Sequence, residues 1–377
     1  MDFSYSEVQQ MLQDSVKKFV NKNYDFDTRS KIIESEAGYS KENWQLFAEL
    51  GWLAVPLSEE DGGLGGSAVD LMVMMEEFGK ANLVEPFLPS AVIGGSLVAE
   101  LATNDQKSQI LEKVVGGNLQ LAYASAETGS RFNVSKVATS AEGKGDDIVI
   151  NGKKIAVLNG PNADQLLVCA RERGGESDAD GISMFLVDPN TPGVTIRPFT
   201  NIDGQKSSEI DFIDVTITGA SRIGDPGDAF AAMEKVNDKA VLGVSAEAVG
   251  VLETLLQKTV EYSKTRKQFG TVIGTFQALQ HRMADMFIEC QLARSIVVMA
   301  AMKLDSSADQ REKTKAVSAA KSRVGKAIRR VSQEAVQIHG GIGVTNELDV
   351  GHYFKRATAL EIMFGNTDYH VERFASL

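Results

Sequence analysis

The stretch EYSKTRKQFGTVIGTFQALQHRMADM, residues 261–286, joins two long runs that have the apolar periodicity of amphipathic helices. Within it, TRKQFG at 265–270 places Arg266 beside a Phe-Gly pair that interrupts the helical pattern. An arginine next to a helix-breaking glycine is a common way to hold an anion, because guanidinium pairs bidentately with phosphate oxygens. The sequence therefore poses two questions: which anion this stretch binds, and whether that anion belongs to this chain.

Length, charge and cysteine content limit the class of protein. The 377 residues suggest two or three domains or one large multilayer unit, and 43% apolar with 24% charged residues is ordinary for a globular protein. A formal net charge of −12 argues against nucleic acid as a partner, so an anionic ligand needs a local basic pocket. Cys169 and Cys290 lack metal-ligand or disulfide spacing and are expected to be packing residues.

The sequence favours a reducing, cytoplasmic setting. The N-terminal stretch MDFSYSEVQQ is acidic and amphipathic, which is not the pattern of a secretory signal. No stretch of about 18 apolar residues is evident, so no membrane span is expected.

The apolar periodicity changes twice along the chain, which predicts three domains. Residues 1–118 have helical patterns, residues 119–222 contain short strand patterns, and residues 223–377 return to long amphipathic helices. A β domain between two helical blocks makes the fold class α+β, with helices long enough for a C-terminal bundle. The C-terminal helices are expected over 240–267, 276–304 and 312–338, the last ended by Gly340-Gly341.

Capping and turn residues predict where several elements begin or end. A capping box is expected at Ser4-Tyr5-Ser6-Glu7, with further helix N-caps at Ser40 and at Asn104-Asp105. The pair Asn151-Gly152 predicts a hairpin turn at the end of a strand. In EIDFIDVTIT, apolar and polar residues nearly alternate, and the slip at Phe212-Ile213 predicts a β-bulge.

Three stretches together resemble the acyl-CoA dehydrogenase family: LGWLAVPLSEEDGGLGG at 50–66, the opening stretch at 261–286, and AVQIHGGIGVTNE at 335–347. The resemblance covers nearly the whole chain and implies an N-terminal helical domain, a middle β domain and a C-terminal four-helix bundle, assembled as tetramers. It also implies FAD as cofactor and an acyl-CoA thioester as substrate. In that family a carboxylate takes the α proton while the β hydrogen leaves as hydride to the flavin, and the electrons pass to an electron-transfer flavoprotein.

The resemblance assigns the basic turn to a cofactor. Arg266 corresponds to the family residue that reaches the FAD pyrophosphate of the neighbouring subunit, so its cofactor would lie mainly on another chain. The further FAD contacts implied are Gln268, Phe269, Ile273, Phe276 and Gln277 around the turn, and Gln337, Gly340 and Gly341 at the adenosine end. The alternative is that Lys264, Arg266 and Lys267 form an exposed helix end, where cations suit the helix dipole. An exposed helix face is the reading for Lys321, Lys326, Arg329 and Arg330.

The residues that a family member uses for its own flavin and substrate depart from the pattern. Ala126, before Glu127, stands where a threonine is expected, while Ala156 and Leu158 replace a tryptophan and a hydroxyl residue of the flavin-facing strand. Phe364 and Ala240 occupy the two positions at which family members carry the catalytic base. Nearby carboxylates that could act as a displaced base are Asp238, Glu361 and Asp368.

The chain departs from the family pattern at the residues for its own flavin and keeps those that reach a neighbour's FAD, which favours a heteromer. The chain resembles the small, non-catalytic subunit of heteromeric members of the family, of the pimeloyl-CoA dehydrogenase type, especially in YDFDTR (24–29) and HYFKRATALEIMFGNTDYH (352–370). It would then clamp FAD in trans within an α2β2 tetramer, while a homologous partner supplies the base for a fatty acyl, dicarboxylic or steroid side-chain thioester. Two alternatives remain: a self-sufficient homotetramer with a displaced base, and a flavin-free binding or scaffold protein.

Overall fold

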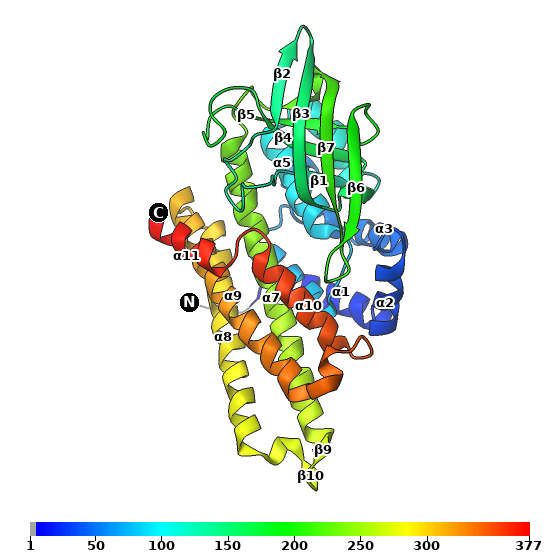
Figure 1. Ribbon diagram of the computed structural model, residues 1–377, viewed down its shortest axis with the longest axis vertical. Helices are drawn as coiled ribbons and strands as arrows, with labels where there is room; N and C mark the ends of the chain where they lie inside the picture. Colours follow the sequence, from blue (N-terminus) through cyan, green and yellow to red (C-terminus); the bar gives the residue numbers. More distant parts are fainter. Residues whose placement is uncertain (1–4) are drawn as a thin grey trace. The chain divides into compact units, whose positions relative to one another are not determined.

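The computed structural model describes residues 5–377, which form two compact units (Figure 1). Unit 1 contains the described residues up to Lys31, Ala68–Leu83 and Val241–Leu377, whereas unit 2 contains Ile32–Ser67 and Val84–Ala240. Helix α7, Phe230–Thr265, contributes residues to both units.

Unit 1 is helical apart from one small hairpin. It contains α1 (Glu7–Asn23), most of α2 (Phe26–Glu34), α4 (Ala68–Ala81), the greater part of α7, α8 (Gln277–Asp305), α9 (Gln310–His339), α10 (Asp349–Ile362) and α11 (Thr367–Ser376). Helix α9 lies beside α8, α10 and α11 (Figure 1). Its buried face follows a helical repeat, since Val317, Val324, Ile328 and Val331 recur at helical spacing and are almost fully buried.

Unit 2 is built around an eight-stranded sheet. Its strands are β1 (Leu121–Ala124), β2 (Ser140–Lys144), β3 (Asp147–Leu158), β4 (Gln165–Arg171), β5 (Ile182–Val187), β6 (Val194–Thr200), β7 (Lys206–Thr218) and β8 (Arg222–Ile223). The sheet order is β6-β7-β3-β2-β4-β5-β8, and β1 pairs in parallel with β4. Alternate strand residues form its apolar core, which includes Ile150, Leu166, Phe185 and Phe212. The unit's helices are α3 (Lys41–Glu49), the π-helical η3 (Phe87–Gly94), α5 (Gly95–Leu101) and α6 (Asn104–Val115).

The bulge predicted in the strand 209–218 is confirmed, but the predicted hairpin turn is wrong. The register between β3 and β7 shifts between Ile150 and Gly152, so that two residues of β7, Ile213 and Asp214, face one residue of β3. Asn151 lies at this shift inside β3, and its side-chain oxygen accepts a hydrogen bond from the Asp214 amide over 2.8 Å. The actual β2–β3 turn contains Gly145, which has φ 68°.

Two of the predicted helix starts are shifted. Ser40 caps α3 as expected, accepting a hydrogen bond from the Asn43 amide. The capping box of α1 is formed by Ser6 and Gln9, whereas Ser4 lies outside the described residues. Helix α6 is capped by Thr103, one residue before the predicted Asn104-Asp105, in a capping box with Gln106.

The sequence predicted no membrane span, and one helix nevertheless has the length and apolar composition of one. Among the described residues, α7 contains an 18-residue window long and apolar enough to cross a membrane, by length and composition only. Within the structure 78% of that window is buried. Because a buried core helix meets the same criterion, this one helix is weak support for a membrane span.

Candidate functional site

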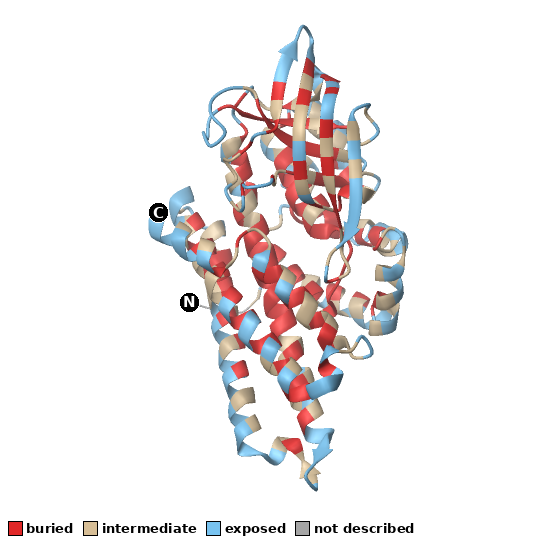
Figure 2. Ribbon diagram, in the orientation of Figure 1, coloured by how far each residue is buried: buried red, intermediate tan, exposed pale blue. Residues whose placement is uncertain are grey.

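The TRKQFG stretch forms a projecting hairpin. Helix α7 ends at Thr265, and strands β9 (Lys267–Gln268) and β10 (Thr271–Val272) then pair antiparallel around a turn. In that turn Phe269 has φ 55° and Gly270 has φ 79°, so the Phe-Gly pair provides the two left-handed residues that reverse the chain. The hairpin is exposed (Figure 2) and leads through η6 (Ile273–Thr275) into α8.

Arg266 is exposed at the base of this hairpin and is able to bind an anion. Its side chain is exposed, and no carboxylate in residues 5–377 forms an ion pair with it. The neighbouring Lys264, in contrast, pairs with Glu261 at 2.9 Å. Phe269 is 91% exposed and meets Phe276 edge to face, with ring centroids 6.2 Å apart. Ile273 is buried and anchors the hairpin, whereas Gln268 and Gln277 are exposed.

The second predicted stretch lies at the end of α9. Gln337 is exposed in the last turn, and Gly340 follows the helix with φ 67°, as the predicted helix end requires. A Cβ added to Gly340 or Gly341 would meet no heavy atom of the described chain within 4 Å, so their backbone is open to a ligand. Tyr262 stacks on His339 with ring centroids 4.3 Å apart, which brings the two predicted stretches together.

In unit 2, two of the positions that depart from the family's pattern of flavin contacts lie side by side. The Ile155 amide donates a hydrogen bond of 2.8 Å to the carbonyl oxygen of Ala126. Ala156 follows at a second register shift of β3, with φ 50° and an exposed side chain. Leu158 is half-buried near the end of the same strand. None of these side chains offers a hydroxyl or an indole to a flavin ring.

Glu127 is retained in the sequence, and the structure gives it a structural partner. Its carboxylate accepts from the Lys154 ammonium at 2.6 Å, from the Thr139 hydroxyl at 2.6 Å and from the Ala138 amide at 2.7 Å. Burial raises the pKa of Glu127, but the ammonium and these hydrogen bonds outweigh it and lower the pKa below its ordinary value. The side chain of Lys154 is fully buried. Glu127 therefore stabilises the sheet.

The structure places no carboxylate at either family base position. Ala240 is buried on α7, and Phe364 is half-buried, with φ 56°, between α10 and α11. Of the three displaced-base candidates, Asp238 is fully buried on α7 and Asp368 is exposed on α11. Glu361 accepts hydrogen bonds from Arg329 and from the backbone amide and hydroxyl of Thr367, so it is occupied in closing the loop.

Lys321 corrects one prediction about the α9 surface. Lys326, Arg329 and Arg330 are exposed as expected, but Lys321 is 1% exposed. Its ammonium donates to the carbonyl oxygens of Leu360, Glu361 and Gly365, at 2.8, 2.8 and 2.9 Å. Burial lowers its pKa to about 7, although the three acceptors match the three donors of the charged form. Lys321 thus holds the loop that contains Phe364.

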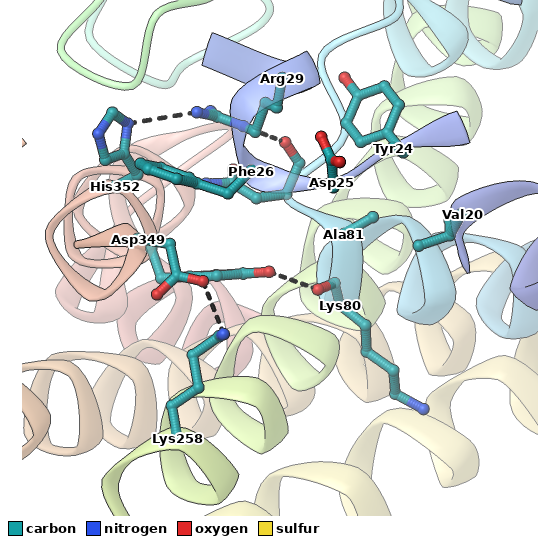
Figure 3. A pocket seen from close by; sticks show the side chains of 12 residues that line it. Val20, Tyr24, Asp25, Phe26, Arg29, Lys80, Ala81, Lys258, Asp349 and His352 are labelled. Carbon is teal, nitrogen blue, oxygen red and sulfur yellow. Dashed lines mark hydrogen bonds and ion pairs between the residues drawn. The ribbon is translucent and has the colours of Figure 1, made fainter. Parts of the chain in front are cut away.

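Unit 1 also contains a small polar cavity, of about 180 Å³, beneath α2 (Figure 3). Arg29 donates to the carbonyl oxygen of Asn82 at 2.6 Å and contacts His352 at 3.4 Å, while Lys258 pairs with Asp349 at 2.6 Å. The sequence-predicted site residues do not line this cavity. It is smaller than the several hundred Å³ typical of sites for drug-sized ligands.

Comparison with known proteins identifies the family. The chain matches models of the acyl-CoA dehydrogenase N-terminal domain over residues 6–118, middle domain over 122–215 and C-terminal domain over 231–376. It is 30% identical over 373 residues to the probable acyl-CoA dehydrogenase YngJ of Bacillus subtilis (strain 168), covering 98% of this chain and 97% of that relative. The chain belongs to the acyl-CoA dehydrogenase family, a family of oxidoreductases.

Two solved structures extend the comparison to a cofactor and a partner chain. The FAD complex of PigA aligns with a TM-score of 0.92 and 27% identity, covering 100% of this chain and 98% of that one. The ChsE4-ChsE5 complex from Mycobacterium tuberculosis aligns with a TM-score of 0.89 and 26% identity, covering 100% and 98%. The predicted acyl-CoA dehydrogenase fold is confirmed, and relatives of this chain bind FAD and assemble with second chains.

The residues present fit one end of FAD better than the other. The exposed Arg266 guanidinium suits a pyrophosphate, and the open backbone at Gly340 and Gly341 suits close approach by a nucleotide. At the ring end, Ala126 and Ala156 offer no polar or stacking side chain. The donor set therefore fits the nucleotide portion and does not fit the isoalloxazine ring.

Proposed function

We propose that this chain is the FAD-clamping subunit of a heterotetrameric acyl-CoA dehydrogenase, in which a homologous chain carries the flavin ring and the catalytic base. The observation that carries the proposal is the exposed Arg266, which forms no ion pair with a carboxylate of residues 5–377 and lies on a hairpin that projects from unit 1. If the chain had lost both its own flavin contacts and its contacts with the FAD of a partner, nothing would keep an arginine at this position of the family pattern. Ala156 and Phe364 support the proposal that a homologous chain carries the flavin ring and the base, because they stand where a family member has a ring contact and a catalytic carboxylate.

Each group on this chain has a binding role in the proposed assembly. Arg266 would pair with the pyrophosphate of a cofactor held mainly by the partner, and its planar guanidinium would fix the orientation of that group. Gln337, Gly340 and Gly341 would contact the adenosine end, with Phe269 covering the apolar side of the contact. When bound, FAD supplies the hydride acceptor for oxidation of the acyl thioester. The partner supplies the carboxylate for the α proton, and an electron-transfer flavoprotein takes the electrons.

Flavin stoichiometry tests this function. The chain is purified alone and after co-expression with a homologous acyl-CoA dehydrogenase chain from the same organism, and FAD per chain and complex mass are measured. We expect no flavin in the chain alone and one FAD per pair of unlike chains in an α2β2 complex. One FAD per chain in a homotetramer would contradict the proposal and favour a displaced base, beginning with Asp238. Absence of flavin from every assembly would favour a scaffold.

A further inference from the structure

Resting on the proposed function, we infer that Tyr262 and His339 form an aligning joint that sets the position of Arg266 relative to Gly340 and Gly341. Neither ring belongs to the set of residues assigned to FAD. Both are instead positioning residues, which act through the segments they connect. The inference rests on three sets of contacts within unit 1.

The first set fixes the hairpin to the end of α7. The Arg266 amide donates to the carbonyl oxygen of Tyr262 over 2.9 Å, so Arg266 lies one helical turn beyond the tyrosine. The Ile273 amide donates to the carbonyl oxygen of Arg266 over 2.8 Å, which closes the base of the hairpin. A Cβ on Gly274 would lie 2.8 Å from the Ser263 carbonyl oxygen, so only glycine allows the hairpin this close to the helix. These contacts tie the position of Arg266 to that of Tyr262.

The second set fixes the glycine turn to the end of α9. His339 is the last residue of α9 and directly precedes Gly340. A Cβ on Gly343 would lie 3.0 Å from the His339 Cβ and 3.1 Å from the Val336 carbonyl oxygen, so the turn η7 (Gly340–Val344) folds tightly over the helix end. The His339 Nδ1 lies 2.7 Å from the Ala335 carbonyl oxygen and therefore carries the proton that it donates.

The third contact joins the two ends. The Tyr262 and His339 rings stack with centroids 4.3 Å apart and planes inclined by 27°. The Tyr262 hydroxyl also donates to the His339 carbonyl oxygen over 3.3 Å, a long hydrogen bond, so the stack is the main contact. His339 is 5% exposed, and burial lowers its pKa, which keeps the ring neutral near pH 7. The joint thus lies one helical turn from Arg266 and one residue from Gly340.

A double-mutant cycle on FAD affinity tests the joint. The variants are Tyr262→Leu, His339→Leu and their combination, with Tyr262→Phe as the variant that keeps the stack. Each is measured in the purified assembly, after removal of FAD, by titration with FAD. Each leucine variant is expected to raise the Kd for FAD about threefold to tenfold. The Kd of the double variant should be no more than about twofold above that of the single variant that binds FAD less tightly. Tyr262→Phe should stay within about threefold of the native assembly because the stack remains.

The outcomes separate the joint from the function on which it rests. If the factors of the two leucine variants multiply in the double variant, the rings act independently and the joint is overturned. If Arg266→Ala weakens FAD binding while the leucine variants leave it unchanged, the joint alone is overturned. If Arg266→Ala itself leaves FAD affinity unchanged, the nucleotide site is elsewhere and both proposals fail.

Hydrogen exchange provides a second measurement that a purely local role would not affect. His339→Gln should raise amide exchange in the hairpin segment 266–276, and Tyr262→Gln should raise it in segment 340–345, because each change removes one ring of the stack and loosens the other segment through the joint. These polar variants also serve if a leucine variant does not fold. Unchanged exchange in the opposite segment for both variants would overturn the inference.

Discussion

The backbone amide of Ile155 donates a hydrogen bond to the carbonyl oxygen of Ala126, so the two segments that would face a flavin ring are joined. The backbone therefore holds the two segments together, and their side chains lack the groups that the family pattern places against a flavin ring. This distinction decides what a single substitution is able to restore.

Placing a carboxylate at position 364 should not give the isolated chain acyl-CoA dehydrogenase activity. We expect Phe364→Glu to leave the isolated chain without acyl-CoA dehydrogenase activity, because Ala126 and Ala156 provide no hold on a flavin ring. The measurement is flavin content and reduction of an artificial electron acceptor with a series of acyl-CoA thioesters. Activity above background in Phe364→Glu, together with bound flavin, would show that this chain carries a working ring site.

Removing the Arg266 guanidinium should lower the FAD content of the assembly. A charge-assisted bidentate contact contributes about 1.5–3 kcal/mol, so Arg266→Ala is expected to weaken FAD binding by at least tenfold. Lys264→Ala is the matched control, because Lys264 is on the same turn but pairs with Glu261. Equal effects of the two substitutions would indicate general electrostatic attraction instead of a specific contact.

Breaking the buried pair between Lys154 and Glu127 should destabilise unit 2. Lys154→Met leaves the Glu127 carboxylate buried without its cation, and the expected loss is about 3–5 kcal/mol in the free energy of unfolding. The adjacent Lys153 pairs with Glu209 at the surface, so Lys153→Met should cost less than about 1 kcal/mol. Urea denaturation followed by intrinsic fluorescence measures both, and similar losses would contradict the assigned roles.

The same pair predicts an acid limit to stability. Because the pKa of Glu127 is lower in the folded chain than in the unfolded one, its contribution is fully present above the ordinary carboxyl pKa. It is lost as pH falls from about 4.5 through the lowered folded value. The Glu127→Gln variant should therefore lose less stability than the native chain over that pH interval. A parallel decline in both would exclude this carboxylate as a source of acid sensitivity.

His370 should make the free energy of unfolding decline over a higher pH range than Glu127 does. It is fully buried, and burial, reinforced by Lys321, lowers its pKa to about 3. Between its ordinary value of 6.5 and 3, the unfolded chain binds a proton that the folded chain does not, so stability falls as pH falls. From pH 7.5 to pH 5 the loss is roughly 2 kcal/mol. His370→Asn should remove this component, whereas His281→Asn, at an exposed position, should retain it.

Substituting Lys321 should loosen the loop between α10 and α11. Lys321→Met leaves the carbonyl oxygens of Leu360, Glu361 and Gly365 without their donor, which is expected to cost about 3 kcal/mol. Lys326→Met, five residues later on the exposed face of α9, should change stability by less than about 0.5 kcal/mol. Chemical denaturation with hydrogen exchange over 360–367 measures both effects. Unchanged exchange there in Lys321→Met would refute the anchoring role.

The sequence predicted the features that depend on the residue pattern within one segment. Helical periodicity located the long C-terminal helices to within about ten residues at each end, and the slip at Phe212-Ile213 located a real bulge. The Asn151-Gly152 turn failed because that pair lies opposite a bulge in β7, and its partner Asp214 is 63 residues away. A turn signal contains no information about a distant strand.

The candidate site was predicted through motif positions, and its supporting contacts were not. The exposed hairpin at Arg266 and the open glycines agree with the residues singled out by the sequence, while their contact with FAD stays a prediction. The burial of Lys321 was missed because lysine is rarely buried and its three acceptors lie about 40 residues away. The stack between Tyr262 and His339 was missed for the same reason, since its rings are 77 residues apart in the chain.

The exposed face of α8 gives the chain a vulnerability of its own. Phe287, Ile288, Leu292 and Met299 are all about half exposed, and Phe269 is almost fully so at the hairpin tip. Made alone, this chain would present these side chains to chaperones and proteases, which recognise apolar surface. If the chain assembles with a homologous chain as proposed, we expect its lifetime in the cell to follow the supply of that chain, so that synthesis of one subunit sets the abundance of the other.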